Sequence, residues 1–114
     1  MGASAEYVEY IKELLGDFPE LITKKYFGGV AFRSSHLGKD KQFAVVLGDT
    51  LYFVVDDQTR PQYEAKGMKP FSYDKKDKTV TVKKWFTAPE ELFEDEIQMR
   101  EWAMQALEAS VRSK

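Results

Sequence analysis

Helical periodicity dominates the start of the chain. Across residues 4–15 the apolar side chains recur on one helical face, at Tyr7, Ile11, Leu14 and Leu15. Ser4 is a suitable N-cap and Gly16 a suitable helix stop. Residues 17–20 then show the cap-then-glutamate spacing that opens a helical turn. The pattern therefore predicts one helix, followed by a second short helix or helical elbow that ends at Lys24 or Lys25.

The pattern becomes that of extended strands after residue 25. Residues 26–33 predict a strand entered through a bend at Gly28 and Gly29, and residues 34–41 predict a polar loop. Two continuous apolar segments, residues 42–47 and 51–55, predict central strands joined by a short hairpin connection.

A second hairpin is predicted from residues 71–75 and 79–86. Its alternation of apolar and polar positions breaks at Trp85, because Trp85 falls on the opposite face from Val82. A bulge, a strand end or a second buried surface must begin at that point.

Two more helices complete the pattern. Residues 56–67 predict a compact helix capped by Asp57 or Thr59, with Gly67 in the left-handed position after its end. The last helical region opens at residue 89, and its apolar side chains from residue 97 to 111 cover an arc of about 220° at about 100° per residue. An amphipathic helix needs a stripe of only about 100°. The final helix therefore has apolar surface to spare around Trp102 and Leu107, and we interpret this surface as one buried against a partner.

The order of elements is α-β-β-β-α-β-β-α, with short connections inside each group of strands. Short connections imply antiparallel neighbours, so we expect an α+β fold with a five-stranded, largely antiparallel sheet and packed helices. Residues 1–114 contain no repeat and no linker, which indicates one domain.

Composition excludes several classes of protein. The chain has no cysteine, which rules out disulfides, thiolate metal sites and a cysteine nucleophile. No apolar run approaches the roughly 18 residues of a membrane span, so we expect a cytoplasmic protein with no membrane partner. The net charge is only −2, but lysines gather between residues 66 and 84 and acids between residues 85 and 114.

Candidate chemistry is sparse, and we expect no enzyme activity, no catalytic residue, no metal and no cofactor. His36 is the only histidine, and its neighbours Ser34 and Ser35 share a polar loop that is ill suited to hold a catalytic triad. The Asp56–Asp57 pair fits a helix cap better than a cation site. Arg60 has two equal interpretations, a contact to an anion or partner and a local ion pair with Asp56 or Asp57.

Lysines near the second hairpin also allow two interpretations. Lys83 and Lys84, with the other lysines between Lys66 and Lys84, could bind nucleic acid, with Tyr73, Trp85 and Phe86 as stacking partners. We favour protection of a sheet edge, because the net charge is negative and no nucleic-acid-binding signature is present.

Short motifs occur in order along residues 21–107. They are Phe27-Gly28-Gly29-Val30, Leu51-Tyr52-Phe53-Val54-Val55-Asp56-Asp57, Thr59-Arg60, Tyr63-Glu64-Ala65 with Gly67, Pro70-Phe71-Ser72-Tyr73, Lys78-Thr79-Val80, Trp85-Phe86, Ala88-Pro89-Glu90-Glu91-Leu92 and Trp102-Ala103 with Ala106-Leu107. This ordered set resembles the N-terminal domain of the TfoX/Sxy competence regulators. The resemblance implies a cytoplasmic bacterial accessory regulator of transcription of DNA-uptake genes, without known enzyme chemistry. It also implies a fold similar to secretion-chaperone-like α+β domains, which commonly associate in pairs.

From the resemblance and the surplus apolar arc we expect a regulatory module that contacts another protein and forms a homodimer. Nucleic-acid binding through the face between Lys66 and Lys84 is the alternative. Full-length regulators of this type carry a second, helical domain, and nothing that belongs to that domain is carried over here. The residues expected to contact a partner are Phe27, Gly28, Gly29, Arg60, Trp85, Phe86 and Trp102.

Overall fold

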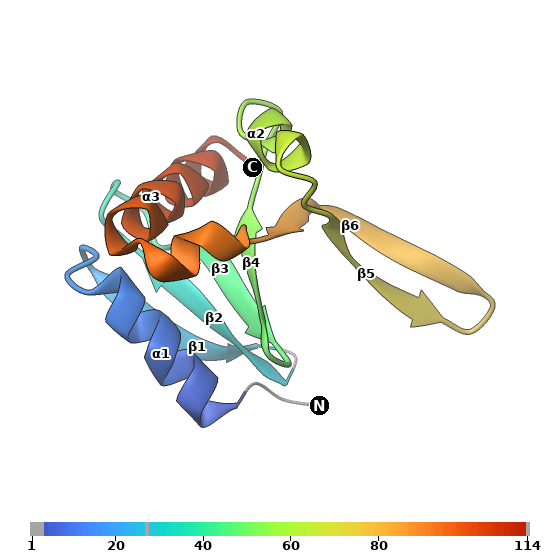
Figure 1. The fold of residues 1–114 in the computed structure, drawn as a ribbon, viewed down its shortest axis with the longest axis horizontal. Helices are drawn as coiled ribbons and strands as arrows, with labels where there is room; N and C mark the ends of the chain where they lie inside the picture. Colours follow the sequence, from blue (N-terminus) through green and yellow to red (C-terminus); the bar gives the residue numbers. More distant parts are fainter. Residues whose placement is uncertain (1–3, 27, 114) are drawn as a thin grey trace.

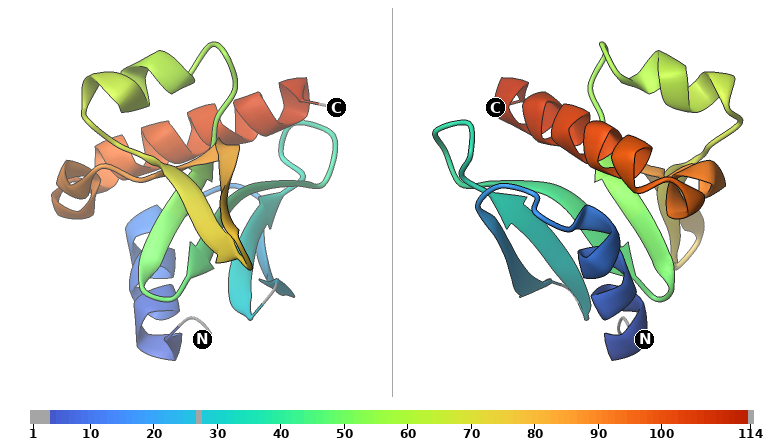
Figure 2. Two further views of the ribbon diagram at one scale, coloured as in Figure 1. Left: turned by 90° about the vertical axis from the view of Figure 1, so that its right-hand side faces the viewer. Right: turned by 60° about the vertical axis from the view of Figure 1, so that its left-hand side comes forward.

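One antiparallel sheet organises the molecule, with α1 and α3 on the same side of it (Figures 1 and 2). The computed structural model describes residues 4–26 and 28–113. The strand order is β1-β2-β3-β4-β6-β5, and each neighbouring pair is antiparallel. The strands are β1 (Leu21–Tyr26), β2 (Gly29–Ser34), β3 (Lys41–Leu47), β4 (Thr50–Val54), β5 (Pro70–Lys75) and β6 (Lys78–Thr87). The predicted α+β class is confirmed, but the sheet has six strands and the predicted five was wrong.

The additional strand is β1, where a helical elbow was expected. Glu20 has a φ of 51°, a left-handed conformation that ends the turn after residue 17 and prevents a helix from continuing. From Leu21 onward the exposed side chains Ile22 and Lys24 alternate with half-buried ones, and the strand pairs with β2 along its whole length. Its β-branched residues suit an extended edge strand, so pairing with β2 outweighed the local cap signal.

The helices lie close to their predicted positions. They are α1 (Ala5–Leu15), α2 (Arg60–Ala65), the 3₁₀ helix η1 (Glu90–Glu94) and α3 (Glu96–Arg112). The side chain of Ser4 accepts a hydrogen bond from the Tyr7 backbone N–H, as expected of an N-cap, and Gly16 follows the end of α1 with a φ of 54°. Gly67 follows α2 with a φ of 76°, also as predicted.

The start of α2 differs from the prediction. The helix is shorter than residues 56–67, and the Thr59 side chain makes no capping hydrogen bond to it. Instead the Asp56 carboxylate accepts hydrogen bonds from the backbone N–H groups of Gln58 and Thr59, each at 3.1 Å. Asp56 therefore stabilises the turn that leads into α2. From the sequence, Asp57 or Thr59 was expected to cap the helix and the aspartate pair to serve as a helix cap.

The main core lies between the helices and the sheet. Trp102 is 8% exposed and Leu107 is fully buried, and the Tyr63 ring meets the Trp102 ring edge-on at 4.8 Å. Of the large apolar side chains on α3, Ile97 stays open to solvent, at 66% exposure. The wide apolar arc of α3 is therefore filled mainly by the chain's own core, because the helix packs against the sheet, α1 and α2 together.

The break in alternation at Trp85 is confirmed as both a bulge and a second buried surface. Strand β6 pairs with β4 through residues 85–87 and with β5 through residues 78–82, and the register shifts between Pro70 and Phe71. Trp85 thereby joins a cluster with Val45 and Val54, separate from the main core. Beyond this shift β5 and β6 leave the body as a two-stranded arm, which we define as residues 71–82 (Figure 1).

An ion pair ties the end of α3 to the turn before α2. The Arg112 guanidinium donates to the Asp56 carboxylate from two nitrogens, at 2.6 and 3.2 Å. Hydrogen bonding to Arg112, then to the Thr59 and Gln58 backbone, lowers the pKa of Asp56 from 3.8 to about 2 against the opposing effect of burial.

We expect Asp56→Asn to lower the free energy of unfolding at pH 7 by roughly 1–2 kcal/mol, a value reduced for the solvent exposure of the pair. Because the pKa of Asp56 is lower in the folded chain, its contribution is complete above about pH 4 and is lost as the pH falls toward 2. Urea unfolding of both proteins at pH 7 and pH 2.5 measures this. If the two proteins differed in free energy of unfolding as much at pH 2.5 as at pH 7, the stabilising role of the Asp56 carboxylate would be contradicted.

Candidate protein-interaction surface

Aromatic side chains form a continuous strip across the sheet face opposite α1 and along the arm. We call this the aromatic strip and define it as Tyr26, Trp85, Phe71 and Tyr73, with Tyr52 beside Phe71. The ring centres of Tyr26 and Trp85 lie 5.8 Å apart, those of Trp85 and Phe71 5.8 Å, and those of Phe71 and Tyr73 5.9 Å. Tyr52 meets Phe71 edge-on at 5.1 Å. Such tilted and edge-on geometries are the favoured ones for aromatic pairs.

The sheet must curl to bring this strip together. Tyr26 belongs to β1 and Trp85 to β6, and three strands separate them in the sheet order. Their ring contact therefore requires the strands to bend around the face that carries the strip. Gly29 permits this bend, because it lets β2 approach β3 closely. A Cβ atom at residue 29 would collide with the backbone of β3. The curvature of the sheet thus brings Tyr26 of β1 next to Trp85 of β6, at the end of the strip that lies on the body.

The arm carries the strip away from the body, and its two faces differ. Phe71 lies opposite Val82 and Tyr73 lies opposite Val80, so these four side chains share one face. Tyr73 is 45% exposed, and the other three are half-buried. The opposite face is polar, where the Thr79 hydroxyl donates to Asp74 at 2.9 Å. The arm therefore presents one apolar, aromatic face that its own chain leaves partly uncovered.

Lysines occupy the tip of the arm. Lys75 lies opposite Lys78 across the hairpin turn, and Lys76 adopts a φ of 48° within the turn. All three are exposed. The surface that the arm offers is thus apolar along one face, and at its end three lysines outnumber Asp74 and Asp77.

The residues that the sequence analysis expected to contact a partner fall in different places. Trp85 lies in the aromatic strip and is 8% exposed, whereas Phe86 points to the opposite face and belongs to the main core. Trp102 is in the main core. Gly28 is exposed and Gly29 buried, while Phe27 lies outside the described residues. Among the described members of this set, the structure therefore brings only Trp85 into the strip.

Sequence reasoning missed the rest of the strip as a unit. Phe71 and Tyr73 lie two residues apart on one strand and pair with Val82 and Val80 on the next. Assigning the residue pairs of the predicted hairpin would have shown that these four side chains share one face. The contribution of Tyr26 and Tyr52 carries no such local signal, because it depends on sheet order and curvature.

Arg60 lies apart from the strip, beside a cleft of about 570 Å³ between α2 and the base of the arm. Its guanidinium pairs with Asp57 at 2.7 Å, which confirms the local ion pair as one of the two interpretations. Its Nε is buried without a hydrogen-bond partner among the described residues. Acidic and basic side chains both line the cleft, namely Asp57, Glu64, Arg60, Lys69 and Lys83.

The residues weighed for a catalytic triad do not converge. The buried Ser34 hydroxyl donates to the Pro19 carbonyl at 2.8 Å and accepts from the His36 backbone N–H at 3.1 Å. Ser34 therefore anchors the loop after β2, and His36 is exposed on that loop. Within residues 4–26 and 28–113, no group of three or more histidine or acidic side chains is placed to hold a metal ion.

The face proposed for nucleic acid is divided by the fold. Of its suggested stacking partners, Tyr73 is open to solvent, whereas Trp85 and Phe86 are buried on opposite sides of the sheet. Lys66 pairs with Glu91 and lies over the Trp102 ring at 5.9 Å, so its charge is used within the chain.

Comparison with known proteins identifies one family. The model of the TfoX N-terminal domain matches residues 13–110, nearly the whole chain. No curated protein matches the chain. In the described part of the chain, no helix has the length and apolar character needed to cross a membrane.

Proposed function

The chain belongs to the TfoX N-terminal domain family, and from this premise we propose that it is a regulatory domain that acts in the bacterial cytoplasm by contacting another protein. It does so through the apolar face of the arm and carries out no covalent chemistry. Competence regulation is the process that the family suggests.

The single observation that supports this proposal is the partly uncovered apolar face of the arm. A two-stranded hairpin is only marginally stable in water unless a third strand or a helix packs on it. Here Phe71, Tyr73, Val80 and Val82 share one face. Phe71 and Val82, at the base of the arm, pack against the cluster of Trp85, whereas no helix in the described part of the chain packs extensively on the arm. Tyr73 in particular exposes 45% of its surface at the middle of the arm. A partner that covers this face would bury aromatic surface of the kind enriched at protein interfaces.

The chemistry of the arm defines the kind of partner. An apolar groove would receive Tyr73 and Val80, and acidic side chains at its end would meet Lys75, Lys76 and Lys78. Strand β5 is an edge of the sheet, so its backbone can also pair with a strand of the partner. A second copy of this chain, which would make a homodimer, is one form that the partner could take.

Nucleic acid is supported less well by the same surface. Binding through stacking needs several exposed aromatic rings beside a basic groove. The arm offers Tyr73, while Asp74 and Asp77 accompany the lysines near its tip.

Photo-crosslinking from the arm tests the proposal. A photoreactive phenylalanine analogue replaces Tyr73 in the intact gene product, expressed in its native cell, and the adducts are identified by mass spectrometry. We expect a protein adduct from position 73, and we expect Val80→Asp in the same chain to reduce it at least about tenfold, because it places a charge in the apolar contact.

Ile97 supplies the matched control, since it is 66% exposed but lies on α3. The same analogue at position 97 should not give the same adduct. An adduct of twice the chain mass would identify a second copy as the partner. Adducts to DNA, or equal adducts from both positions, would count against the proposal. Thermal unfolding of the Val80→Asp variant shows whether the body of the domain remains folded.

A further inference from the structure

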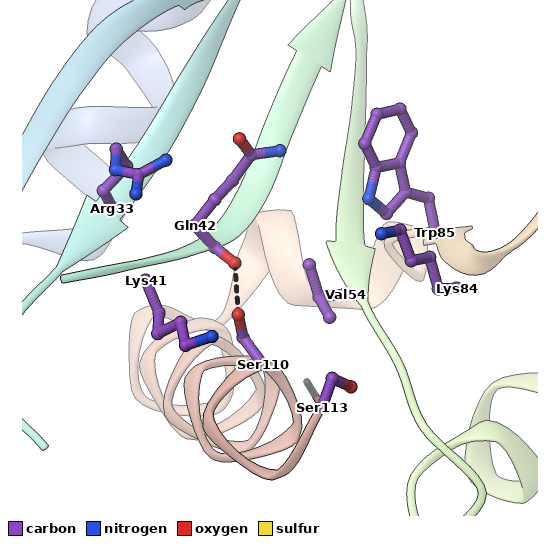
Figure 3. A pocket seen from close by; sticks show the side chains of 8 residues that line it. All are labelled: Arg33, Lys41, Gln42, Val54, Lys84, Trp85, Ser110 and Ser113. Carbon is purple, nitrogen blue, oxygen red and sulfur yellow. Dashed lines mark hydrogen bonds between the residues drawn. The ribbon is translucent and has the colours of Figure 1, made fainter. Parts of the chain in front are cut away.

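A small basic pocket lies at the C-terminal end of α3 (Figure 3), and no residue of the arm lines it. Its volume is about 230 Å³. Five elements meet there, namely the end of β2, the start of β3, the end of β4, the bend of β6 and the C-terminal end of α3. They contribute Arg33, Lys41, Lys84, Trp85, Ser110 and Ser113 to its walls, with Gln42 and Val54.

Positive charge converges on this pocket. The amino groups of Lys41 and Lys84 point into it from opposite sides, and the Arg33 guanidinium lies at its rim (Figure 3). No carboxylate is among the described residues that line it. Neither lysine has an ion-pair partner within 4.0 Å among the described side chains.

The charges of the described residues do not neutralise the pocket. Asp40 pairs with Arg33 at 3.2 Å from outside the wall and cancels one positive charge. The C-terminal end of α3 contributes a partial charge of only about −0.5. Among the described residues, the two lysines therefore outweigh this partial negative charge, and the resulting positive potential attracts an anion.

Fixed polar groups give the pocket a defined shape. The Ser110 hydroxyl donates to the Gln42 carbonyl at 2.7 Å and thereby holds α3 against β3 (Figure 3). The Ser113 hydroxyl donates to the Ala109 carbonyl at 3.1 Å. Val54 and Trp85 form an apolar wall, which lowers the local dielectric and strengthens the field of the lysines.

We propose that this pocket binds a small oxyanion of the phosphate type, held between Lys41 and Lys84 with Arg33 at the rim. Lysine ammonium groups are common phosphate ligands, and charge-assisted hydrogen bonds are the strongest kind in proteins. Pockets for larger organic ligands usually occupy about 300–1,000 Å³, so the volume of about 230 Å³ here suits a small anion better than a larger organic ligand. The site is separate from the partner contact of the arm and does not depend on it.

Tryptophan indole signals give a direct readout of binding. The chain has two tryptophans, of which Trp85 lines the pocket and Trp102 lies in the main core. In two-dimensional NMR spectra each indole N–H gives one signal, assigned with a Trp85→Phe variant. Titration with inorganic phosphate at constant ionic strength should shift the Trp85 signal saturably and leave the Trp102 signal in place.

Variants locate the anion. The double variant Lys41→Gln with Lys84→Gln should weaken phosphate binding at least about tenfold, since each charge-assisted hydrogen bond is worth about that factor or more. Lys78→Gln removes one lysine from the tip of the arm and is the matched control, which should bind phosphate as the unaltered chain does. Thermal unfolding shows that each variant is folded.

Several results would overturn the proposal. These are an equal shift with chloride at the same ionic strength, an equal loss in Lys78→Gln, or unchanged phosphate binding in a folded double variant. A short single-stranded oligonucleotide distinguishes the two sources of phosphate. If it binds more tightly than phosphate and depends on Lys78, the basic surface serves a nucleic-acid backbone and the small-anion pocket is refuted.

Discussion

Replacing Gly29 by alanine is expected to destabilise the fold by about 3 kcal/mol or more, one of the two largest effects in this chain. A Cβ atom at this position would lie 2.1 Å from the carbonyl oxygen of Val46 and 2.7 Å from Cδ2 of Leu47. Neither distance is compatible with van der Waals contact. The neighbour at the shorter distance is backbone, which cannot rotate away as a side chain can.

Relief of this collision would require β2 and β3 to separate at the point where the sheet curls. That movement would disturb the pairing of Val30 with Val46 and the contact that brings Tyr26 against Trp85. The loss should therefore appear both in the free energy of unfolding from urea denaturation and in the near-ultraviolet circular dichroism of the aromatic strip.

Gly48 provides the control for Gly29. Its φ is 62°, but a Cβ atom there would meet nothing within 4 Å. Gly48→Ala should cost only the left-handed conformation, about 1–2 kcal/mol. Equal losses at both positions would show that backbone conformation, and not the close approach of β3, determines the requirement for glycine at residue 29.

Trp102→Ala is expected to lower the free energy of unfolding by about 3–5 kcal/mol, as for other large-to-small changes in cores. Trp102 packs edge-on against Tyr63, and both rings belong to the main core between α2, α3 and the sheet. Removal of the indole would leave a cavity between α2, α3 and the sheet. The backbone of these elements cannot move far enough to close it. The exposed Ile97 of the same helix is the control, and Ile97→Ala should change stability by less than about 0.5 kcal/mol.

Protein concentration separates a core role for Trp102 from an interface role. If Trp102 is covered only by its own chain, the loss of stability should be the same at about 2 and about 100 micromolar protein. These two concentrations lie below and above the dissociation constant expected of a weak dimer. A loss that grows with concentration, with sedimentation showing a dimer that the variant abolishes, would return Trp102 to a subunit interface.

The two proposals for this domain use different parts of the same curled sheet. The arm extends the sheet beyond the region that the helices cover, so its aromatic face remains available to a partner. The basic pocket lies where α3 ends against the start of β3. Trp85 belongs to the aromatic strip and also lines the pocket, but no residue of the arm lines the pocket. A substitution in the arm should therefore leave the pocket intact.

The sequence by itself determined the elements whose signals are local. Helix α1 carries its own cap and stop, the pairs β3–β4 and β5–β6 are adjacent hairpins, and the left-handed Gly67 ends α2. The parity change at Trp85 also indicated the second buried surface before any strand order was known. Each of these features depends on residues within one or two turns or strands of each other.

Only the tertiary structure decided which surfaces cover one another. The cap signal at residues 17–20 favoured a helix, but β2 offered β1 a full row of hydrogen-bonding partners and an edge strand formed instead. The wide arc of α3 suggested a partner, but the sheet, α1 and α2 together cover it. Periodicity identifies which side chains avoid water, and it contains no information about the distant segment that shields them. The aromatic strip and the basic pocket likewise arise from strand order and curvature, which bring residues far apart in the chain into contact.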